Sequence, residues 1–91
     1  MKLSQIIKVA YQESEKALKK NEVPVGAVIF NDKKIISKAH NLVIKNNDPL
    51  AHAEYIAIKK AVKKLKTTNL KGYKIYSLSL IHISEPTRLR L

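Results

Sequence analysis

Residues 24–30, P-V-G-A-V-I-F, form the nearly continuous apolar run that most restricts how this chain can fold. A strand with one face in water alternates apolar and polar residues, whereas a strand covered on both faces is apolar almost throughout. The run therefore predicts a strand buried between two layers. Gly26 lies inside it, which indicates that a helix or a ligand approaches the backbone closely at this point.

The segments before and after this run supply a partner strand and a covering layer. Turn residues N-D-K at positions 31–33 precede a second apolar segment over residues 34–39, so the two strands should form an antiparallel hairpin. An amphipathic helix is predicted over residues 4–20, with Ser4 as its cap. Its inward face should comprise Ile6, Ile7, Ala10, Ala17 and Leu18.

Residues 47–60, N-D-P-L-A-H-A-E-Y-I-A-I-K-K, read as the start of a second helix after a polar loop over residues 41–47. Asp48 is a favourable N-cap, and Pro49 suits the first helical position because no backbone N–H is needed there. Its apolar stripe should comprise Ile58, Val62 and Leu65.

A third strand is predicted over residues 73–77, after a turn at residues 70–72. The order helix, hairpin, helix, strand predicts an α/β fold with helices on the sheet faces.

His52 and Glu54 fall in the first turn of the second predicted helix. Residues two apart do not share a helix face, so this pair can serve one site only at the open N-terminal end. The unpaired N–H groups and the helix dipole favour an anion or a metal-bound hydroxide at that end.

Three motifs carry a resemblance to a known family. They are E-V-P-V-G-A-V-I-F at residues 22–30, A-H-N at 39–41 and D-P-L-A-H-A-E at 48–54. Together they resemble the cytidine deaminase-like superfamily, and within it most closely the bacterial tRNA-specific adenosine deaminases. The resemblance covers about residues 1–77. It implies part of a cytidine deaminase-like three-layer α/β/α sandwich, and a zinc-dependent hydrolase that converts adenosine to inosine in tRNA.

The resemblance also implies roles for individual residues. His52 corresponds to a zinc ligand, and Glu54 to the general acid/base that exchanges protons with water and substrate. Asn41 matches a position whose side-chain amide contacts the substrate base or nucleoside; the other interpretation is a loop residue that caps a turn. His40 is expected to be a structural or surface histidine.

The end of the chain departs from the family pattern. Family members complete the zinc site with two thiolates in a T-L-E-P-C-x-x-C segment, whereas this sequence contains no cysteine. At the family spacing the two cysteines would fall near His82 and Glu85, and we regard that coincidence as accidental. Residues 78–88, L-S-L-I-H-I-S-E-P-T-R, resemble the translation of a transposase adapter used in sequencing libraries.

We therefore expect residues 1–77 to be the N-terminal portion of a deaminase domain and residues 78–91 to be a non-native tail. The first residues of that tail should extend the third strand. The 91-residue chain itself should be inactive.

The charge balance favours an anionic partner. Lys and Arg number 18 against 7 Asp and Glu, a formal net charge of +11 at pH 7, which favours nucleic acid. Taken with the E-V-P-V-G-A-V motif, the family resemblance implies that this nucleic acid is tRNA. Solubility, or the lysine bias of an AT-rich genome, explains the same balance. Two other functions stay open: a fragment of a guanine- or cytosine-type free-base or nucleoside deaminase, and a basic RNA-binding module without catalysis.

The remaining expectations concern location and assembly. No apolar run is long enough to span a membrane, the N-terminus does not resemble a signal peptide, and disulfides are excluded. We expect a cytoplasmic protein without membrane partners. The family resemblance implies a homodimer for the full-length protein.

Overall fold

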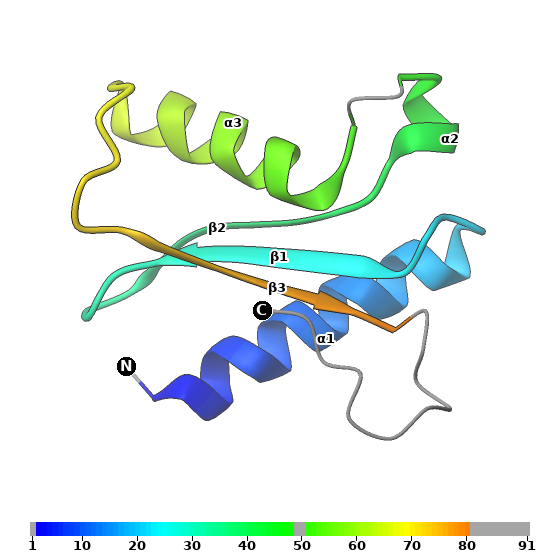
Figure 1. Ribbon diagram of the computed structural model, residues 1–91, viewed down its shortest axis with the longest axis horizontal. Helices are drawn as coiled ribbons and strands as arrows, with labels where there is room; N and C mark the ends of the chain where they lie inside the picture. Colours follow the sequence, from blue (N-terminus) through cyan, green and yellow to red (C-terminus); the bar gives the residue numbers. More distant parts are fainter. Residues whose placement is uncertain (1, 49–50, 81–91) are drawn as a thin grey trace.

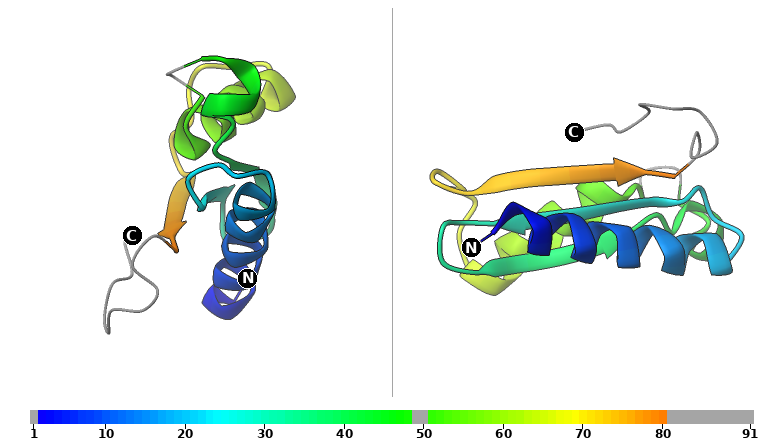
Figure 2. Two further views of the ribbon diagram at one scale, coloured as in Figure 1. Left: turned by 90° about the vertical axis from the view of Figure 1, so that its right-hand side faces the viewer. Right: turned by 90° about the horizontal axis from the view of Figure 1, so that it is seen from below.

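Two helices enclose an antiparallel sheet in the computed structural model, which describes residues 2–48 and 51–80. The elements in chain order are α1 (Leu3–Lys19), β1 (Val25–Phe30), β2 (Ile35–His40), α2 (Val43–Asn46), α3 (Ala53–Leu65) and β3 (Lys74–Ser79). The strand order is β2-β1-β3, and β1 pairs antiparallel with both neighbours. Helices α1 and α3 lie on opposite faces of this sheet (Figures 1 and 2), so the predicted three-layer α/β/α arrangement is confirmed.

Strand β1 is buried on both faces, as its apolar sequence predicts. Val28 packs toward α1 with Ile6, whereas Ala27 and Ile29 belong to the core beneath α3. The rest of the α1-side core comprises Ala10, Tyr76 and Leu78. The rest of the α3-side core comprises Ile36, Ala39, Ala53, Ala57 and Ala61. The hairpin turn also forms as predicted, because the Asn31 side chain accepts the N–H groups of Lys33 and Lys34, each at 2.9 Å.

Gly26 marks the closest approach of α1 to the sheet. A Cβ atom added at Gly26 would collide with the Ala10 carbonyl oxygen and would lie 2.8 Å from the Ser14 amide nitrogen. The predicted close backbone approach is therefore confirmed, and the neighbour is a helix.

Both long helices begin elsewhere than the sequence predicts. Helix α1 begins at Leu3 with Lys2 at the N-cap, so the prediction that Ser4 caps it is wrong. Helix α3 begins at Ala53 with His52 at the N-cap, so the prediction of Asp48 as its cap is wrong. Asp48 instead closes a turn, because its carbonyl accepts the N–H of Ala51 at 3.0 Å. Pro49, predicted at the first helical position, lies outside the described residues.

The inward face of α1 also differs from the prediction. Ile7 and Leu18 are 37% and 55% exposed. Glu13 and Ser14 are buried in their place, and each has a polar partner. A buried polar group is tolerated when it is hydrogen-bonded, which a pattern of apolar residues alone does not reveal.

Alanines form the buried face of α3. Ala53, Ala57 and Ala61 are fully buried, whereas Ile58 is 42% exposed, so the predicted place of Ile58 in the buried stripe is wrong. Small side chains allow the helix to lie close to the sheet, and the buried Ser37 hydroxyl donates to the Ala57 carbonyl at 2.8 Å. The closeness of the two layers therefore selects small residues, rather than the most apolar ones, for the inward face of α3.

The loop after β2 is partly helical. The predicted polar loop at residues 41–47 contains the short helix α2. Strand β3 continues past residue 77 to Ser79, and Leu78 is 2% exposed and pairs with Gly26, so the predicted extension is confirmed this far. His82, Glu85 and the remainder of the tail lie outside the described residues. Among the residues that are described, no helix has the length and apolar character needed to cross a membrane.

Glu13 makes stability dependent on pH. Burial by itself would raise the pKa of this carboxyl, but hydrogen bonds from His40 and Lys16 outweigh that effect and hold the pKa below its ordinary value of 4.5. Because the folded-state pKa is depressed, the stabilisation is fully present above the ordinary pKa and is lost as the pH falls through the folded-state pKa. The stability deficit of Glu13→Gln relative to the wild type should therefore shrink in acid, below about pH 4.5.

Urea unfolding between about pH 7 and about pH 3 measures this deficit. Glu15→Gln, the same chemical change on the same helix, is the control with which the Glu13→Gln deficit is compared at each pH. A Glu13→Gln deficit that stays constant over this range would contradict the assignment.

Candidate active site

His52 and Glu54 lie together at the N-terminal end of α3, as predicted. His52 is the N-cap residue, with extended backbone angles (φ −75°, ψ 154°), and its carbonyl accepts the N–H of Ile56 at 3.0 Å. Glu54 follows in the first turn, and both side chains are exposed. The pair is thus available to solvent where the helix presents its unpaired N–H groups.

Asn41 connects the sheet to this helix start. It follows the last residue of β2, is 3% exposed, and its backbone N–H donates to the Val25 carbonyl at 3.2 Å. Its side-chain Oδ1 accepts the N–H of Ala53 at 2.7 Å. Asn41 is therefore beside the His52–Glu54 end of α3. It does cap a local structure, but that structure is the start of a helix and not a turn.

Asn41→Ala should destabilise the 91-residue chain by about 1–3 kcal/mol, because the buried Ala53 N–H would lose its acceptor. Asn46→Ala, in exposed α2, is the control and should stay within about 0.5 kcal/mol of the wild type. Urea unfolding followed by circular dichroism measures both. Equal stabilities for the two variants would show that the Asn41 contact does not fix the start of α3.

Glu22 holds the segment that follows Asn41, a role that the sequence analysis missed. Its carboxylate accepts the N–H groups of Ile44 at 3.0 Å and Lys45 at 2.8 Å, at the start of α2. Desolvation raises the pKa of Glu22, but these two hydrogen bonds, aided by the charge of Lys20, hold the pKa below its ordinary value. The one available signal is that Glu22 begins the first of the three motifs.

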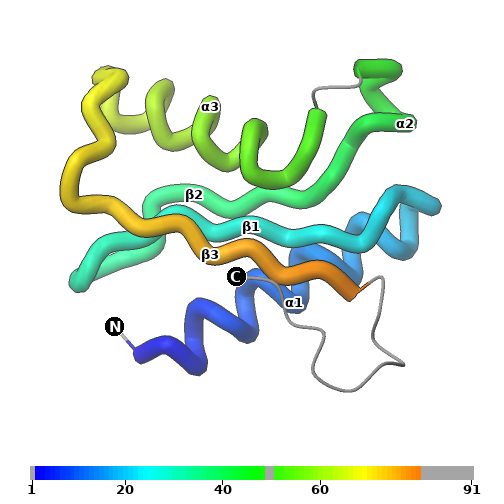
Figure 3. The backbone as a smooth tube through the Cα atoms, in the orientation of Figure 1, coloured from blue at the N-terminus to red at the C-terminus, as the bar shows by residue number. Residues whose placement is uncertain are grey.

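His40 ties the end of β2 to α1 and so has a structural role, as expected. Its Nδ1 lies 2.9 Å from Oε1 of Glu13, and its Nε2 lies 3.2 Å from Nζ of Lys20. A lysine ammonium can only donate, so Nε2 accepts from Lys20 and Nδ1 donates to the carboxylate. This network fixes the strand end next to Asn41, and Figure 3 shows the end of α1, α2 and the start of α3 gathered at the same end of the molecule.

The described residues do not by themselves form a complete zinc site. An exposed imidazole at a helix end, as in His52, suits a zinc ligand, but a catalytic zinc takes three protein ligands and a water. Within residues 2–48 and 51–80, no group of three His, Cys, Asp or Glu side chains could hold a metal ion. A catalytic zinc at His52 would therefore require further ligands from outside this part of the chain.

Known proteins share both the sequence and the fold. The tRNA-specific adenosine deaminase of Aquifex aeolicus is 51% identical over 70 residues, which cover 77% of this chain and 46% of that protein. The Bacillus subtilis protein of the same name is 43% identical over 70 residues, covering 77% of this chain and 44% of that protein. The chain thus spans about half the length of these curated relatives.

Solved structures agree with this similarity. A structure from a study of A-to-I editing by tRNA:A34 deaminases at the wobble position superposes with a TM-score of 0.79 at 32% identity, covering 82% of this chain and 58% of that one. Guanine deaminase from Bacillus subtilis superposes with a TM-score of 0.77 at 35% identity, covering 85% and 50%.

The family comparison covers nearly the whole chain. Residues 1–86 match the cytidine and deoxycytidylate deaminase zinc-binding region. This match includes all three motifs and the helix start that carries His52 and Glu54. The chain therefore belongs to the cytidine and deoxycytidylate deaminase family, through its zinc-binding region.

Proposed function

We propose that this chain is the N-terminal portion of a zinc-dependent hydrolytic deaminase that converts adenosine to inosine in tRNA. The observation that carries the proposal is the joint exposure of His52 and Glu54 at the start of α3, where the Asn41 side chain holds the first helical N–H. Relatives named tRNA-specific adenosine deaminase, 51% and 43% identical over the matched residues, support this substrate over others.

Each site residue has a distinct part in this proposal. His52 supplies one imidazole ligand, and zinc in such sites lowers the pKa of its bound water to about 7. Glu54 exchanges protons with water and with the leaving amine, a task that requires it to stay off the metal. The Oδ1 of Asn41 already accepts the Ala53 N–H, so a contact with the substrate would use the amide N–H donors of Asn41.

The proposal for the full-length protein also includes a partner, a cellular location and an oligomeric state. Net charge +11 supports tRNA as the partner, because phosphates attract a basic surface. The absence of cysteine from the sequence is compatible with a cytoplasmic location. We propose a homodimer on the family resemblance alone.

A second candidate function is deamination of a free base. The similarity to Bacillus subtilis guanine deaminase, 35% identical with a TM-score of 0.77, favours it. The two functions differ in substrate size, so an assay with both substrates separates them.

The test uses a chimera of residues 1–77 with the C-terminal part of the Aquifex aeolicus tRNA-specific adenosine deaminase. That part should bring the two thiolate ligands that the family resemblance implies. We expect zinc binding, inosine formation in tRNA and no ammonia release from guanine. The 91-residue chain, which has no cysteine, should bind zinc weakly and form no inosine.

The intact Aquifex aeolicus protein is the positive control. Guanine turnover by the chimera without inosine formation would favour the second candidate function. A chimera that binds zinc and tRNA but deaminates neither substrate would favour the RNA-binding module instead. Inosine formation by the 91-residue chain would show that its zinc site does not need the thiolates.

A further inference from the structure

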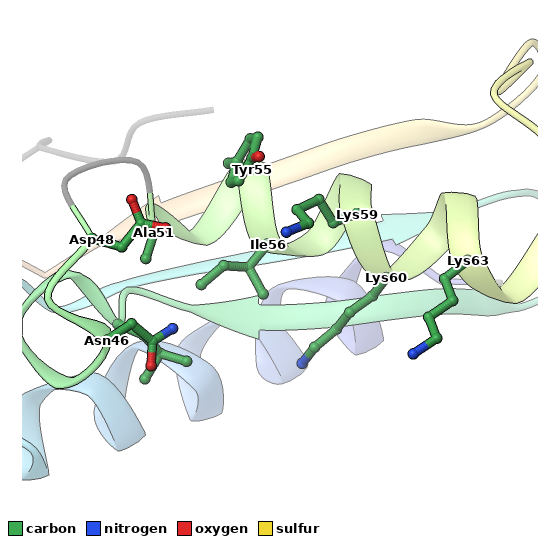
Figure 4. A pocket seen from close by; sticks show the side chains of 9 residues that line it. Asn46, Asp48, Ala51, Tyr55, Ile56, Lys59, Lys60 and Lys63 are labelled. Carbon is green, nitrogen blue, oxygen red and sulfur yellow. The ribbon is translucent and has the colours of Figure 1, made fainter.

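A cavity of about 290 Å³ opens beside α3. It is lined by residues of α2, of the following segment and of α3 (Figure 4). Its polar and aromatic lining comprises Asn46, Asp48, Tyr55, Lys59, Lys60 and Lys63. We refer to it as the α2–α3 cavity.

The α2–α3 cavity is basic. Three lysines line it against one aspartate, and all three belong to exposed positions of α3. Lys60 is engaged by the sheet, because its Nζ donates to the Lys38 carbonyl at 3.1 Å. Lys59 and Lys63 are four residues apart, which places them on one helix face about 6 Å apart along the axis. Two neighbouring phosphates of a nucleic acid strand can be contacted at such a spacing.

Tyr55 adds an aromatic surface to these charges. Lys59 Nζ lies 5.4 Å from the centroid of the Tyr55 ring, and the tyrosine is 44% exposed. Proteins that bind single-stranded nucleic acids combine a partly exposed aromatic ring, on which a base stacks, with cations that contact the phosphates. A free inorganic anion has no base that could stack on the Tyr55 ring, so the ring favours a nucleic acid as the ligand.

The cavity adjoins the candidate active site. Ala51, which lines it, directly precedes His52, and Leu42, which also lines it, directly follows Asn41. From the start of α3 to Lys63 the helix rises about 15 Å, a length that a few nucleotides can span. A strand whose target nucleotide occupies the N-terminal end of α3 can therefore reach these lysines.

We propose that the α2–α3 cavity binds the phosphodiester backbone of single-stranded RNA next to the target nucleotide. Lys59 and Lys63 contact neighbouring phosphates, and the Tyr55 ring stacks on a base. This inference rests on the proposed function for its choice of RNA, and it adds a binding surface on α3 beyond His52 and Glu54.

The test measures how binding of a fluorescein-labelled single-stranded oligoadenylate to the 91-residue chain depends on salt. Each phosphate contact on a single strand contributes about 0.7 to the slope of log K against log salt. Lys59→Gln/Lys63→Gln should therefore reduce the slope by about 1.4. Lys60 is left unchanged in this variant, because its Nζ donates a hydrogen bond to the Lys38 carbonyl of β2. Circular dichroism establishes that each variant is folded.

The matched control is Lys8→Gln/Lys33→Gln, which removes the same charge from exposed positions on α1 and on the hairpin turn. It should change the slope by less than half as much as the cavity pair. An equal change in the two pairs would overturn the proposal, and so would binding by the wild type that is insensitive to salt.

Two further measurements identify the ligand. Tyr55→Leu should weaken oligoadenylate binding by about fivefold or more, as expected for loss of a stacked base. AMP should compete poorly, since it offers one phosphate; competition by AMP at the concentration of the oligomer would show a mononucleotide site and overturn the proposal.

Inosine formation by the chimera and binding by the 91-residue chain are measured separately, so this inference and the proposed function can fail independently. If the chimera forms no inosine while the Lys59 and Lys63 pair still controls binding, the cavity proposal stands and the deaminase proposal fails. If the chimera forms inosine while Lys59→Gln/Lys63→Gln leaves the salt slope of oligoadenylate binding unchanged, the deaminase proposal stands and the cavity proposal fails.

Discussion

Glu54→Gln in the chimera should lower kcat for inosine formation in tRNA by about a hundredfold or more. A positioned acid/base typically contributes that much, and glutamine keeps the shape of the side chain without accepting a proton. Glu54 is exposed in the first turn of α3, so its replacement breaks no buried contact of the described residues. The rate in a single-turnover assay is the measurement, with tRNA affinity determined in parallel.

Glu15→Gln is the control for this substitution, because it makes the same chemical change on α1. It should leave the rate within a few-fold of the parent chimera. A Glu54→Gln rate close to that of the control would mean that another group transfers the proton.

Gly26→Ala should destabilise the 91-residue chain by about 3 kcal/mol or more, the upper end of what overpacking costs. The added Cβ would meet backbone atoms of α1, at Ala10 and Ser14, which cannot rotate away as a side chain would. Either α1 must move off the sheet or β1 must shift. Urea unfolding followed by circular dichroism measures the loss.

Gly72→Ala provides the contrast. Gly72 has φ +87°, and a Cβ added there would meet nothing within 4 Å, so its cost should come from the left-handed backbone alone, about 1–2 kcal/mol. A loss at Gly26 no larger than the loss at Gly72 would contradict the packing of α1 against β1.

The parts of the fold that sequence predicts are those determined locally. The apolar run around Val28 identifies a doubly covered strand, and the Asn31 turn identifies the hairpin, because each depends on neighbouring residues only. Gly26 also predicts a close approach, although the sequence does not show whether a helix or a ligand is the neighbour.

The parts that sequence does not predict depend on distant partners. Asp48 has the chemistry of an N-cap, yet Asn41, 12 residues from Ala53, supplies the acceptor and moves the start of α3 to Ala53. Ile58 is more apolar than Ala57, yet the short distance between helix and sheet selects the alanine. Tertiary contacts override local preference in both cases.

The candidate site likewise has features that the sequence predicts and features that only the structure reveals. The helix period and the motif were sufficient to place His52 and Glu54 at an open helix end. The hydrogen bond from the Ala53 N–H to Asn41 and the one from the Ile44 N–H to Glu22 could be identified only from the structure. No spacing in the sequence indicates that these groups are partners.

The zinc content of purified His52→Ala and Glu54→Gln chimeras tests the division of roles at this site most directly. The metal bound per chain, relative to the parent chimera, is measured after dialysis at neutral pH. We predict that His52→Ala loses zinc, because a ligand is removed, and that Glu54→Gln retains it, because Glu54 stays off the metal. Loss of zinc from Glu54→Gln, or its retention by His52→Ala, would contradict the account.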